Sequence, residues 1–244
     1  MHQSRVLALA AAVAVVAAAC SAGQSSTPDA TDATDTSTVT TVPLNVVPGD
    51  YAGYLRQPTA CGAEQPTPAV DMKFDSPEDA GIDGPTIVSM KTSCGTIDIM
   101  LDPTTAPETV NSFAFLAESG YFDGTVSHRI IPGFMMQAGD PTATGLGGPG
   151  YTIPDEFPDE SNYRRGVVAM ANAGPGTTGS QFFILFSDAE WLPPTFTILG
   201  EVINGFEALD KIEQISLGRS TNSADPNPST PLESLYIESV TVVR

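Results

Sequence analysis

The chain has 244 residues, of which 41% are hydrophobic, and its formal net charge is −19, from 29 acidic and 10 basic residues. The length suits one domain with additional segments, or at most two domains, and the hydrophobic fraction is sufficient for a core. So large an excess of negative charge repels phosphate backbones, and nucleic acid is therefore not expected as a partner.

Residues 1–19 have the pattern of an export signal. A short polar and basic start precedes an uninterrupted apolar run from Val6 to Ala19, which is too short to span a bilayer comfortably. Cys20 follows directly, and Val16-Ala17-Ala18-Ala19-Cys20 resembles a bacterial lipobox, in which the cysteine is lipidated and becomes the mature N-terminus. We therefore expect an exported protein held at the outer face of the cell membrane by a lipid anchor alone. An ordinary Ala-x-Ala cleavage site, which would give a secreted protein, is the alternative.

Two segments separate this signal from the first regular pattern. Residues 20–50 are mostly Ser, Thr, Asp, Ala and Pro, a composition that cannot bury enough apolar surface to offset ordering, so a flexible linker is expected. Residues 51–85 contain large apolar side chains that can pack on a domain, such as Tyr51 and Tyr54, but several prolines interrupt any regular element. The interruptions predict an extended arm, partly docked on a domain that begins at residue 86 and runs to 244.

The remaining cysteines are Cys61 in the arm and Cys94 in the domain. Because the signal sends the chain out of the reducing cytoplasm, we expect a disulfide between them that pins the arm. Two cysteines and one histidine, His128, cannot assemble a four-ligand zinc site once the signal with His2 is removed. No structural metal is therefore expected.

From residue 86 the chain shows short β-branched runs separated by turns. Thr86 to Lys91 and Thr96 to Leu101 predict a hairpin. A helix is predicted at 106–119, where apolar residues recur at helical spacing after a capping-box pattern of Thr105 and Glu108. Gly120 is expected to end this helix in a left-handed conformation.

The rest of the domain is predicted to be mostly strands. These are expected at 125–131, 134–138, 166–171, 180–186, 197–203 and 235–243, with a second short helix at 206–215. Residues 217–231, rich in Ser, Asn, Asp and Pro, are predicted to form an exposed loop. Many strands and few helices favour a β-barrel or a β-sandwich, and periodicity does not choose between them.

Three segments carry a resemblance to a known family. They read His-Arg-Ile-Ile-Pro-Gly-Phe-Met-Met-Gln-Ala-Gly-Asp at 128–140, Ala-Asn-Ala-Gly-Pro-Gly-Thr-Thr-Gly-Ser-Gln-Phe-Phe-Ile at 171–184, and Glu-Trp-Leu at 190–192. In this order and spacing they resemble cyclophilins, over roughly residues 87–244. The resemblance implies an eight-stranded antiparallel barrel capped by two helices, and peptidyl-prolyl cis/trans isomerase activity without a cofactor.

The expected reaction needs only a few groups on the protein. Rotation about an X-Pro bond must overcome a barrier of about 18–20 kcal/mol that comes from its partial double-bond character. A socket for the proline ring, hydrogen bonds to the flanking backbone and a cation near the prolyl nitrogen would suffice, with no nucleophile or proton shuttle. Arg129 fits the cationic role, because its guanidinium stays charged and carries several donors.

The resemblance also implies a role for each candidate site residue. It makes Arg129 the principal catalytic residue, with Phe134 and Gln137 completing the catalytic set. The expected proline pocket is formed by Phe134, Met135, Phe183 and Leu192, and the backbone groove by Gln137, Ala171, Asn172 and Gln181. Trp191 matches the rim position associated with cyclosporin binding, so a cyclosporin-type ligand is a possible partner.

The chain departs from the family pattern at three places. Phe196 stands where many relatives carry His or Tyr, Ser127 replaces a frequent aromatic residue, and Pro193-Pro194 replaces a common Asp-Gly turn. These departures affect the expected rate, substrate preference and drug affinity more than the fold.

Two function classes stay open on the sequence. The first is an isomerase, expected to be monomeric, that acts on unfolded or extended proline-containing polypeptides of the envelope. The second is a module that binds proline segments as a chaperone or scaffold with little turnover. A hydrolase finds no support, because after export only His128 remains to act as a base.

Overall fold

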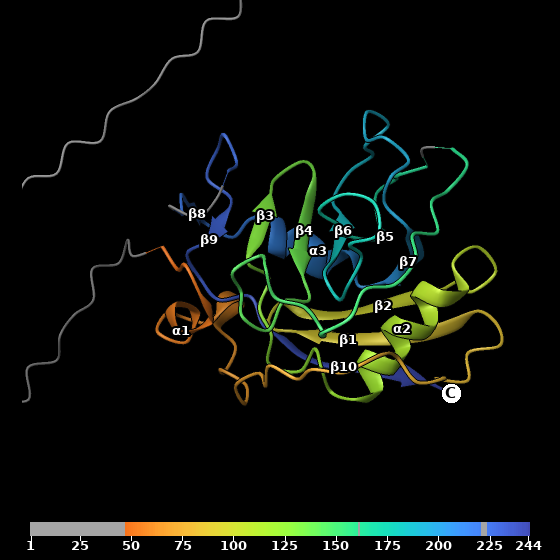
Figure 1. The fold of residues 1–244 in the computed structure, drawn as a ribbon. Helices are drawn as coiled ribbons and strands as arrows, with labels where there is room; N and C mark the ends of the chain where they lie inside the picture. The colour runs from red at the N-terminus through yellow and green to blue at the C-terminus, as the bar shows by residue number, and fades with distance from the viewer. Residues whose placement is uncertain (1–46, 161, 221–223) are drawn as a thin grey trace, which may run out of the picture. The chain divides into compact units, whose positions relative to one another are not determined.

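Eight antiparallel strands form one curled sheet (Figure 1). In this computed structural model the residues described are 47–160, 162–220 and 224–244, so the predicted signal, Cys20 and most of the predicted linker lie outside them. The strand order is β10-β1-β2-β7-β5-β6-β4-β3. The bounds are β1 Thr86–Thr92, β2 Gly95–Leu101, β3 Arg129–Ile131, β4 Met135–Ala138, β5 Val167–Met170, β6 Phe182–Leu185, β7 Ile198–Asn204 and β10 Ile237–Val243. The mainly β fold and the first hairpin are confirmed.

Hydrogen bonds link the two edges of the sheet, β3 and β10. The residues before β3 run antiparallel to those before β10, with Val126 opposite Tyr236 in an isolated bridge. The amide of Ser127 donates to the carbonyl of Leu235 at 2.9 Å. The strand predicted at 125–131 is therefore divided: only Arg129–Ile131 pairs with β4, and the preceding residues pair with the chain that leads into β10.

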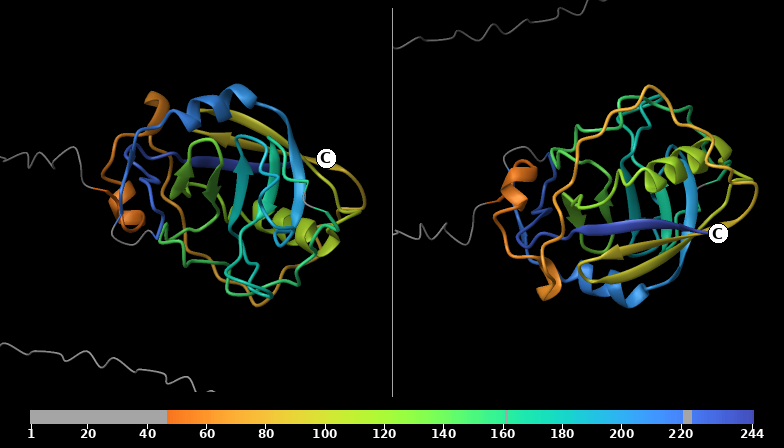
Figure 2. Two further views of the ribbon diagram at one scale, coloured as in Figure 1. Left: turned by 90° about the horizontal axis from the view of Figure 1, so that it is seen from above. Right: turned by 90° about the horizontal axis from the view of Figure 1, so that it is seen from below.

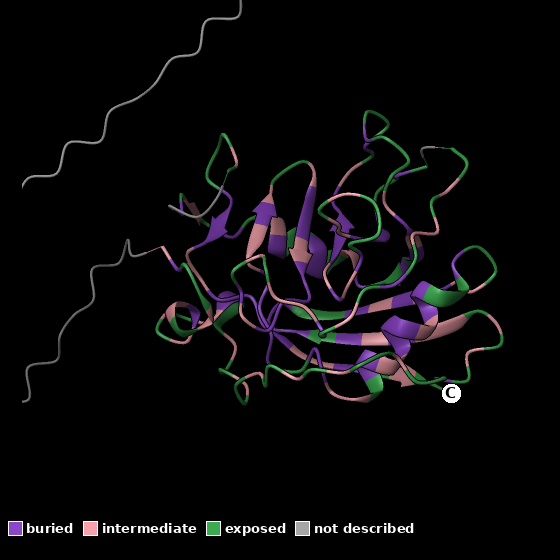
Figure 3. Cartoon of the chain, in the orientation of Figure 1, coloured by how far each residue is buried: buried purple, intermediate pink, exposed green. Residues whose placement is uncertain are grey.

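Alternation of apolar residues along β1 and β2 builds the core. The side chains of Val88, Met90, Ile97, Ile99 and Leu101 point to one face and have no exposed surface, because successive residues of a strand face opposite sides. Burial is concentrated in the strands and helices, whereas the connecting loops are largely exposed (Figure 3).

Two helices cover the curled sheet at different places (Figure 2). Helix α2, Pro107–Glu118, packs beside β10, and α3, Phe206–Glu213, packs beside β2. Both helices were predicted. Among the described residues, no helix is long and apolar enough to cross a bilayer.

The two ends of α2 are formed in different ways. The capping box predicted from Thr105 and Glu108 is wrong, because Ala106 is the N-cap residue and provides no side-chain bond. The carboxylate of Glu156 instead accepts the amides of Glu108 and Thr109 at 3.1 and 2.8 Å. A distant acid thus satisfies the free amides of the first turn and complements the helix dipole. At the other end Gly120 has a φ of 71°, as predicted.

The segment at 51–85 lies against the sheet domain. It is less extended than predicted, since α1, Tyr51–Tyr54, and a 3₁₀ turn at Ala60–Gly62 occur in it. The side chain of Tyr54 is buried, and its hydroxyl donates to the carbonyl of His128 at 3.2 Å. Further along, the amide of Phe74 donates to the carbonyl of Pro149 at 2.7 Å.

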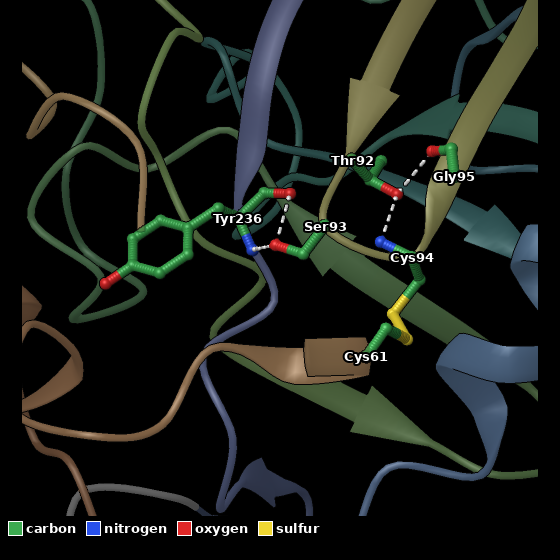
Figure 4. Close-up of a disulfide and its surroundings, with 6 residues drawn as sticks. All are labelled: Cys61, Thr92, Ser93, Cys94, Gly95 and Tyr236. Carbon is green, nitrogen blue, oxygen red and sulfur yellow. Dashed lines mark hydrogen bonds between the residues drawn. A yellow bond between two sulfur atoms is a disulfide. The ribbon is translucent and has the colours of Figure 1, made fainter. Parts of the chain in front are cut away.

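A disulfide joins this arm to the turn between β1 and β2 (Figure 4). Cys61 and Cys94 are 33 residues apart in sequence, and their Cα atoms are 5.2 Å apart. The turn itself is held from the other side, because the hydroxyl of Ser93 accepts the amide of Tyr236 at 2.9 Å. The bond thus connects the arm to a part of the sheet that is already fixed.

The predicted exposed loop at 217–231 has more structure than its composition indicated. Its ends pair as a small two-stranded sheet of β8, Leu217–Gly218, and β9, Thr230–Pro231. The side chains of Ser229 and Thr230 are buried. The amide of Ile130 in β3 donates to the carbonyl of Ser229 at 2.8 Å, which places the base of this loop next to β3.

Candidate functional site

The hairpin of β3 and β4 positions the central residues of the site. Pro132 and Gly133 form its turn, in which the amide of Phe134 donates to the carbonyl of Ile131 at 3.0 Å. Gly133 has a φ of 73°, as the third position of a type II turn requires. The resulting register places Arg129 directly opposite Gln137, so their side chains emerge on the same face.

Arg129 is bound on two sides. Its Nη1 donates to Oε1 of Gln137 at 3.0 Å. Its Nε and Nη2 donate to the two carboxylate oxygens of Asp225 at 2.7 and 2.6 Å. The arginine side chain remains 34% exposed, against 14% for Asp225, so the side chain is held by these bonds and still partly reaches solvent.

A row of amide side chains continues from Arg129 along the sheet. Nε2 of Gln137 donates to Oε1 of Gln181 at 2.9 Å. Nε2 of Gln181 in turn donates to the carbonyls of Gly145 and Gly147 at 3.0 and 2.9 Å. Because each amide both accepts and donates, the chain of bonds fixes the orientation of every member.

An apolar cluster lies beside this row and is separate from the main core. It contains the buried Met135, Phe183 and Leu192, with Phe134 and Phe196 packed against it. Phe183 is directly opposite Gln137 across β4 and β6, so the cluster adjoins the polar row. Residues that could have been ordinary core packing thus form a second apolar surface next to Arg129.

Aromatic rings form the outer part of that cluster. The ring of Phe134 lies 4.8 Å from that of Trp191, and the ring of Phe183 meets that of Phe196 edge to face at 5.5 Å. Trp191 is 68% exposed, which places it at the rim. Phe196 is held from behind, because the Tyr163 hydroxyl donates to its carbonyl at 2.8 Å and accepts its amide at 3.1 Å.

Two cavities share Gln137 as a lining residue. The larger, of about 680 Å³, is lined by Ala171, Asn172 and Gln181 among others. The smaller, of about 330 Å³, is lined by His128, Arg129 and Asp225 among others. The residues predicted to form a backbone groove are therefore gathered around one opening.

Part of the hydrogen-bonding capacity predicted for this groove is used within the protein. The amide of Ala171 donates to the carbonyl of Gln181 at 2.8 Å, and Nδ2 of Asn172 donates to the carbonyl of Thr195 at 2.9 Å. The Asn172 side chain also accepts the amide of Gly174 at 3.2 Å. Asn172 therefore shapes the loop that follows it, while its position still lines the larger cavity.

His128 does not have the properties of a general base. Burial lowers its pKa to about 4, against the opposing effect of the nearby Asp140 carboxylate and with a smaller contribution from Arg129. Its Nδ1 atom is buried and has no hydrogen-bond partner among the residues described. The imidazole is therefore neutral at pH 7 and carries no charge into the site.

Three residues that the sequence did not single out also reach the site. Asp225 comes from the 217–231 loop, Tyr163 fixes the backbone of Phe196, and Lys73 of the arm lines the larger cavity. None belongs to a local motif. Only the long-range contacts of the folded chain bring them to the sheet.

Comparisons with known proteins identify the family. The family model described as cyclophilin type peptidyl-prolyl cis-trans isomerase/CLD matches residues 87–242. A peptidyl-prolyl cis-trans isomerase B of Streptomyces anulatus is 45% identical over 170 residues, which are 63% of this chain and 94% of that protein. The chain belongs to the cyclophilin family.

Two further matches extend the comparison. A probable peptidyl-prolyl cis-trans isomerase B of Mycobacterium leprae is 37% identical over 62% of this chain and 56% of its own length. A cyclophilin-type isomerase of Cryptosporidium parvum, crystallised in the presence of the dipeptide Ala-Pro, matches with a TM-score of 0.59 and 34% identity. That match covers 65% of this chain and 99% of the solved one.

The family match begins at Ile87, so the arm at 51–85 lies outside the cyclophilin domain. The arm nevertheless supplies Lys73 to the larger cavity, where its Nζ donates to the carbonyl of Gly148 at 2.7 Å. The site of this cyclophilin therefore includes a residue from beyond the matched region.

Proposed function

We propose that this cyclophilin accelerates cis/trans isomerisation of X-Pro bonds in unfolded or extended polypeptides, with Arg129 as the principal catalytic residue. The observation that carries the proposal is the position of Arg129 beside Gln137, one strand away from an apolar cluster that contains Phe183. A fixed cation next to an apolar surface is what rotation about a prolyl bond requires.

In the proposed mechanism the apolar cluster of Phe134, Met135, Phe183 and Leu192 holds the proline ring. The guanidinium of Arg129 donates to the carbonyl before the ring and approaches the prolyl nitrogen. As the bond twists, the nitrogen becomes pyramidal and its lone pair localises, so a nearby N–H donor stabilises the twisted form more than either planar form. No proton is transferred, which agrees with a neutral, partly buried His128.

The substrate class is proposed from the same surface. The Cryptosporidium parvum neighbour was crystallised with Ala-Pro, and this supports proline-containing peptides as ligands here. The exposed Trp191 at the rim supports a cyclosporin-type ligand as well. Because Trp191 is the only tryptophan, its fluorescence would report such binding directly.

The competing function is a module that binds proline segments with little turnover. Exchange NMR on a peptide with one X-Pro bond separates the two. An isomerase at substoichiometric concentration gives exchange cross-peaks between the cis and trans signals, because it shortens an exchange time that is otherwise tens to hundreds of seconds. Shifted signals without such cross-peaks would favour the binding module.

We also propose that the protein is exported and anchored through a lipid on Cys20. The apolar run from Val6 to Ala19 and the lipobox-like residues before Cys20 support this proposal. Wild type is expected to partition with membranes and into detergent, and Cys20→Ser is expected to be released. Equal release of both proteins would favour ordinary cleavage and secretion.

A further inference from the structure

Asp225 makes the closest polar contacts that Arg129 has to another side chain, at 2.6 and 2.7 Å. We propose that Asp225 is a positioning residue, which holds the Arg129 guanidinium in the orientation that the isomerisation needs. The proposal rests on the proposed function, since it assigns Asp225 a role in the same reaction. Asp225 contacts Arg129 but does not contact the reacting bond.

The hydrogen bonds of the guanidinium define that orientation. An arginine carries five N–H donors in one plane. Asp225 takes the Nε donor and one Nη2 donor, and Gln137 takes one Nη1 donor. This leaves one donor on Nη1 and one on Nη2 for a substrate, and the plane that contains them is fixed from two sides.

Asp225 is itself held in place. The guanidinium of Arg219 donates to the carbonyls of Asp225 and Pro226 at 3.1 and 2.5 Å. At the base of the loop, β8 pairs with β9, and the carbonyl of Ser229 accepts the amide of Ile130, the residue that follows Arg129. The carboxylate and the arginine are thus attached to the same edge of the sheet, which keeps their relative position constant.

The contact has opposing effects on the reaction. A carboxylate this close weakens the positive potential that Arg129 presents to the prolyl nitrogen. It also removes the rotamer freedom of a long side chain, so the ordering cost is met before the substrate binds. We expect positioning to dominate, because bidentate pairing is the geometry that restrains a guanidinium most.

The first test compares wild type with Asp225→Ala in the full-length protein, by exchange NMR on an Ala-Pro-containing peptide. The expected result is a fall of about tenfold in kcat with little change in KM, because the positioned donors act on the twisted bond and the apolar cluster still binds the ring. Asp225→Glu is expected to recover part of the rate. Asp225→Asn keeps the shape of the side chain but loses its charge, and it is expected to have a low kcat. This variant replaces Asp225→Ala in the test if the alanine variant unfolds.

A matched control is Asp210→Ala. Asp210 forms a similar ion pair with Arg165 at 2.7 Å, away from the site, and its removal is expected to leave the rate unchanged. A double-mutant cycle with Arg129→Ala provides the second test: once the arginine is absent, removing Asp225 should have no further effect. The Nε–H resonance of Arg129 gives a readout apart from activity, and it should broaden or shift in Asp225→Ala.

The outcomes distinguish this inference from the proposed function. If Arg129→Ala is slow and Asp225→Ala keeps the wild-type rate, the positioning role is wrong and the catalytic role of Arg129 stands. A faster Asp225→Ala would equally overturn it, because the carboxylate would then act as a brake through its charge. If Arg129→Ala keeps the wild-type rate, the catalytic assignment fails and the positioning role fails with it.

Discussion

Removing the bond between Cys61 and Cys94 is expected to lower the free energy of unfolding by several kcal/mol. The two cysteines are 33 residues apart. In the chain-entropy model a closed loop of that length removes about 12.5 cal/mol/K from the unfolded ensemble, which is about 3.7 kcal/mol at 25 °C. Measured disulfides typically stabilise a protein by about 2–4 kcal/mol, so the expected loss lies in that range.

Chemical unfolding measures this loss directly. Urea curves of the oxidised protein and of the protein in dithiothreitol should differ in midpoint, with the Cys61→Ala/Cys94→Ala variant close to the reduced protein. Cys20→Ser in every sample prevents mixed disulfides. Dithiothreitol should have no effect on the double variant, which controls for effects of the reductant itself.

The contacts of the arm indicate what should remain of its docking after the disulfide is reduced. Tyr54 and Ala60 of the arm are buried, and Phe74 stacks edge to face on Phe115 with ring centres 5.0 Å apart. The arm should therefore remain docked in the native state when the bond is reduced, with the effect confined to the stability. Coinciding oxidised and reduced curves would refute the reasoning, since the loop would then have no entropic effect on unfolding.

Two other predictions concern the site. Burial lowers the pKa of His128 from an ordinary 6.5 to about 4, so between these two pH values the unfolded protein binds a proton that the folded protein does not. The free energy of unfolding should therefore fall as the pH is lowered from 6.5 toward 4, by up to about 3 kcal/mol in total. Urea midpoints at pH 7.5 and 5 should differ more for wild type than for His128→Gln, and parallel shifts would contradict this assignment. Phe196→His adds a polar group beside Phe183, so it should change the relative catalytic efficiencies for peptides with Ala, Phe or Glu before proline. A uniform change for all three would show that Phe196 does not set specificity.

Local pattern was sufficient for much of the fold. The β-branched runs at 86–101 predicted the first hairpin, and the apolar spacing before Gly120 predicted α2, because both elements depend on neighbours in sequence. The motif around Arg129 and Gln137 likewise identified residues that the β3–β4 register places opposite each other.

The errors have a common physical cause. The start of α2 is capped by Glu156, 48 residues from Glu108, and no local pattern could select that carboxylate over Thr105. The loop at 217–231 has the composition of an exposed segment, yet Asp225 is bound to Arg129, 96 residues away in sequence. Such contacts depend on how the sheet curls and on which of its edges meet. The composition of a segment contains no information about either.

The central claim is that Arg129 carries the isomerisation. The most direct measurement is the cis/trans exchange rate of an Ala-Pro-containing peptide with wild type, Arg129→Ala and, as a control for loss of an exposed arginine, Arg164→Ala, all at equal concentration. Arg129→Ala is predicted to stay folded and to lose most of the exchange rate, because its partly exposed side chain serves the twisted bond and not the core. Arg164→Ala is predicted to match wild type. Equal exchange rates for all three folded proteins would contradict the account.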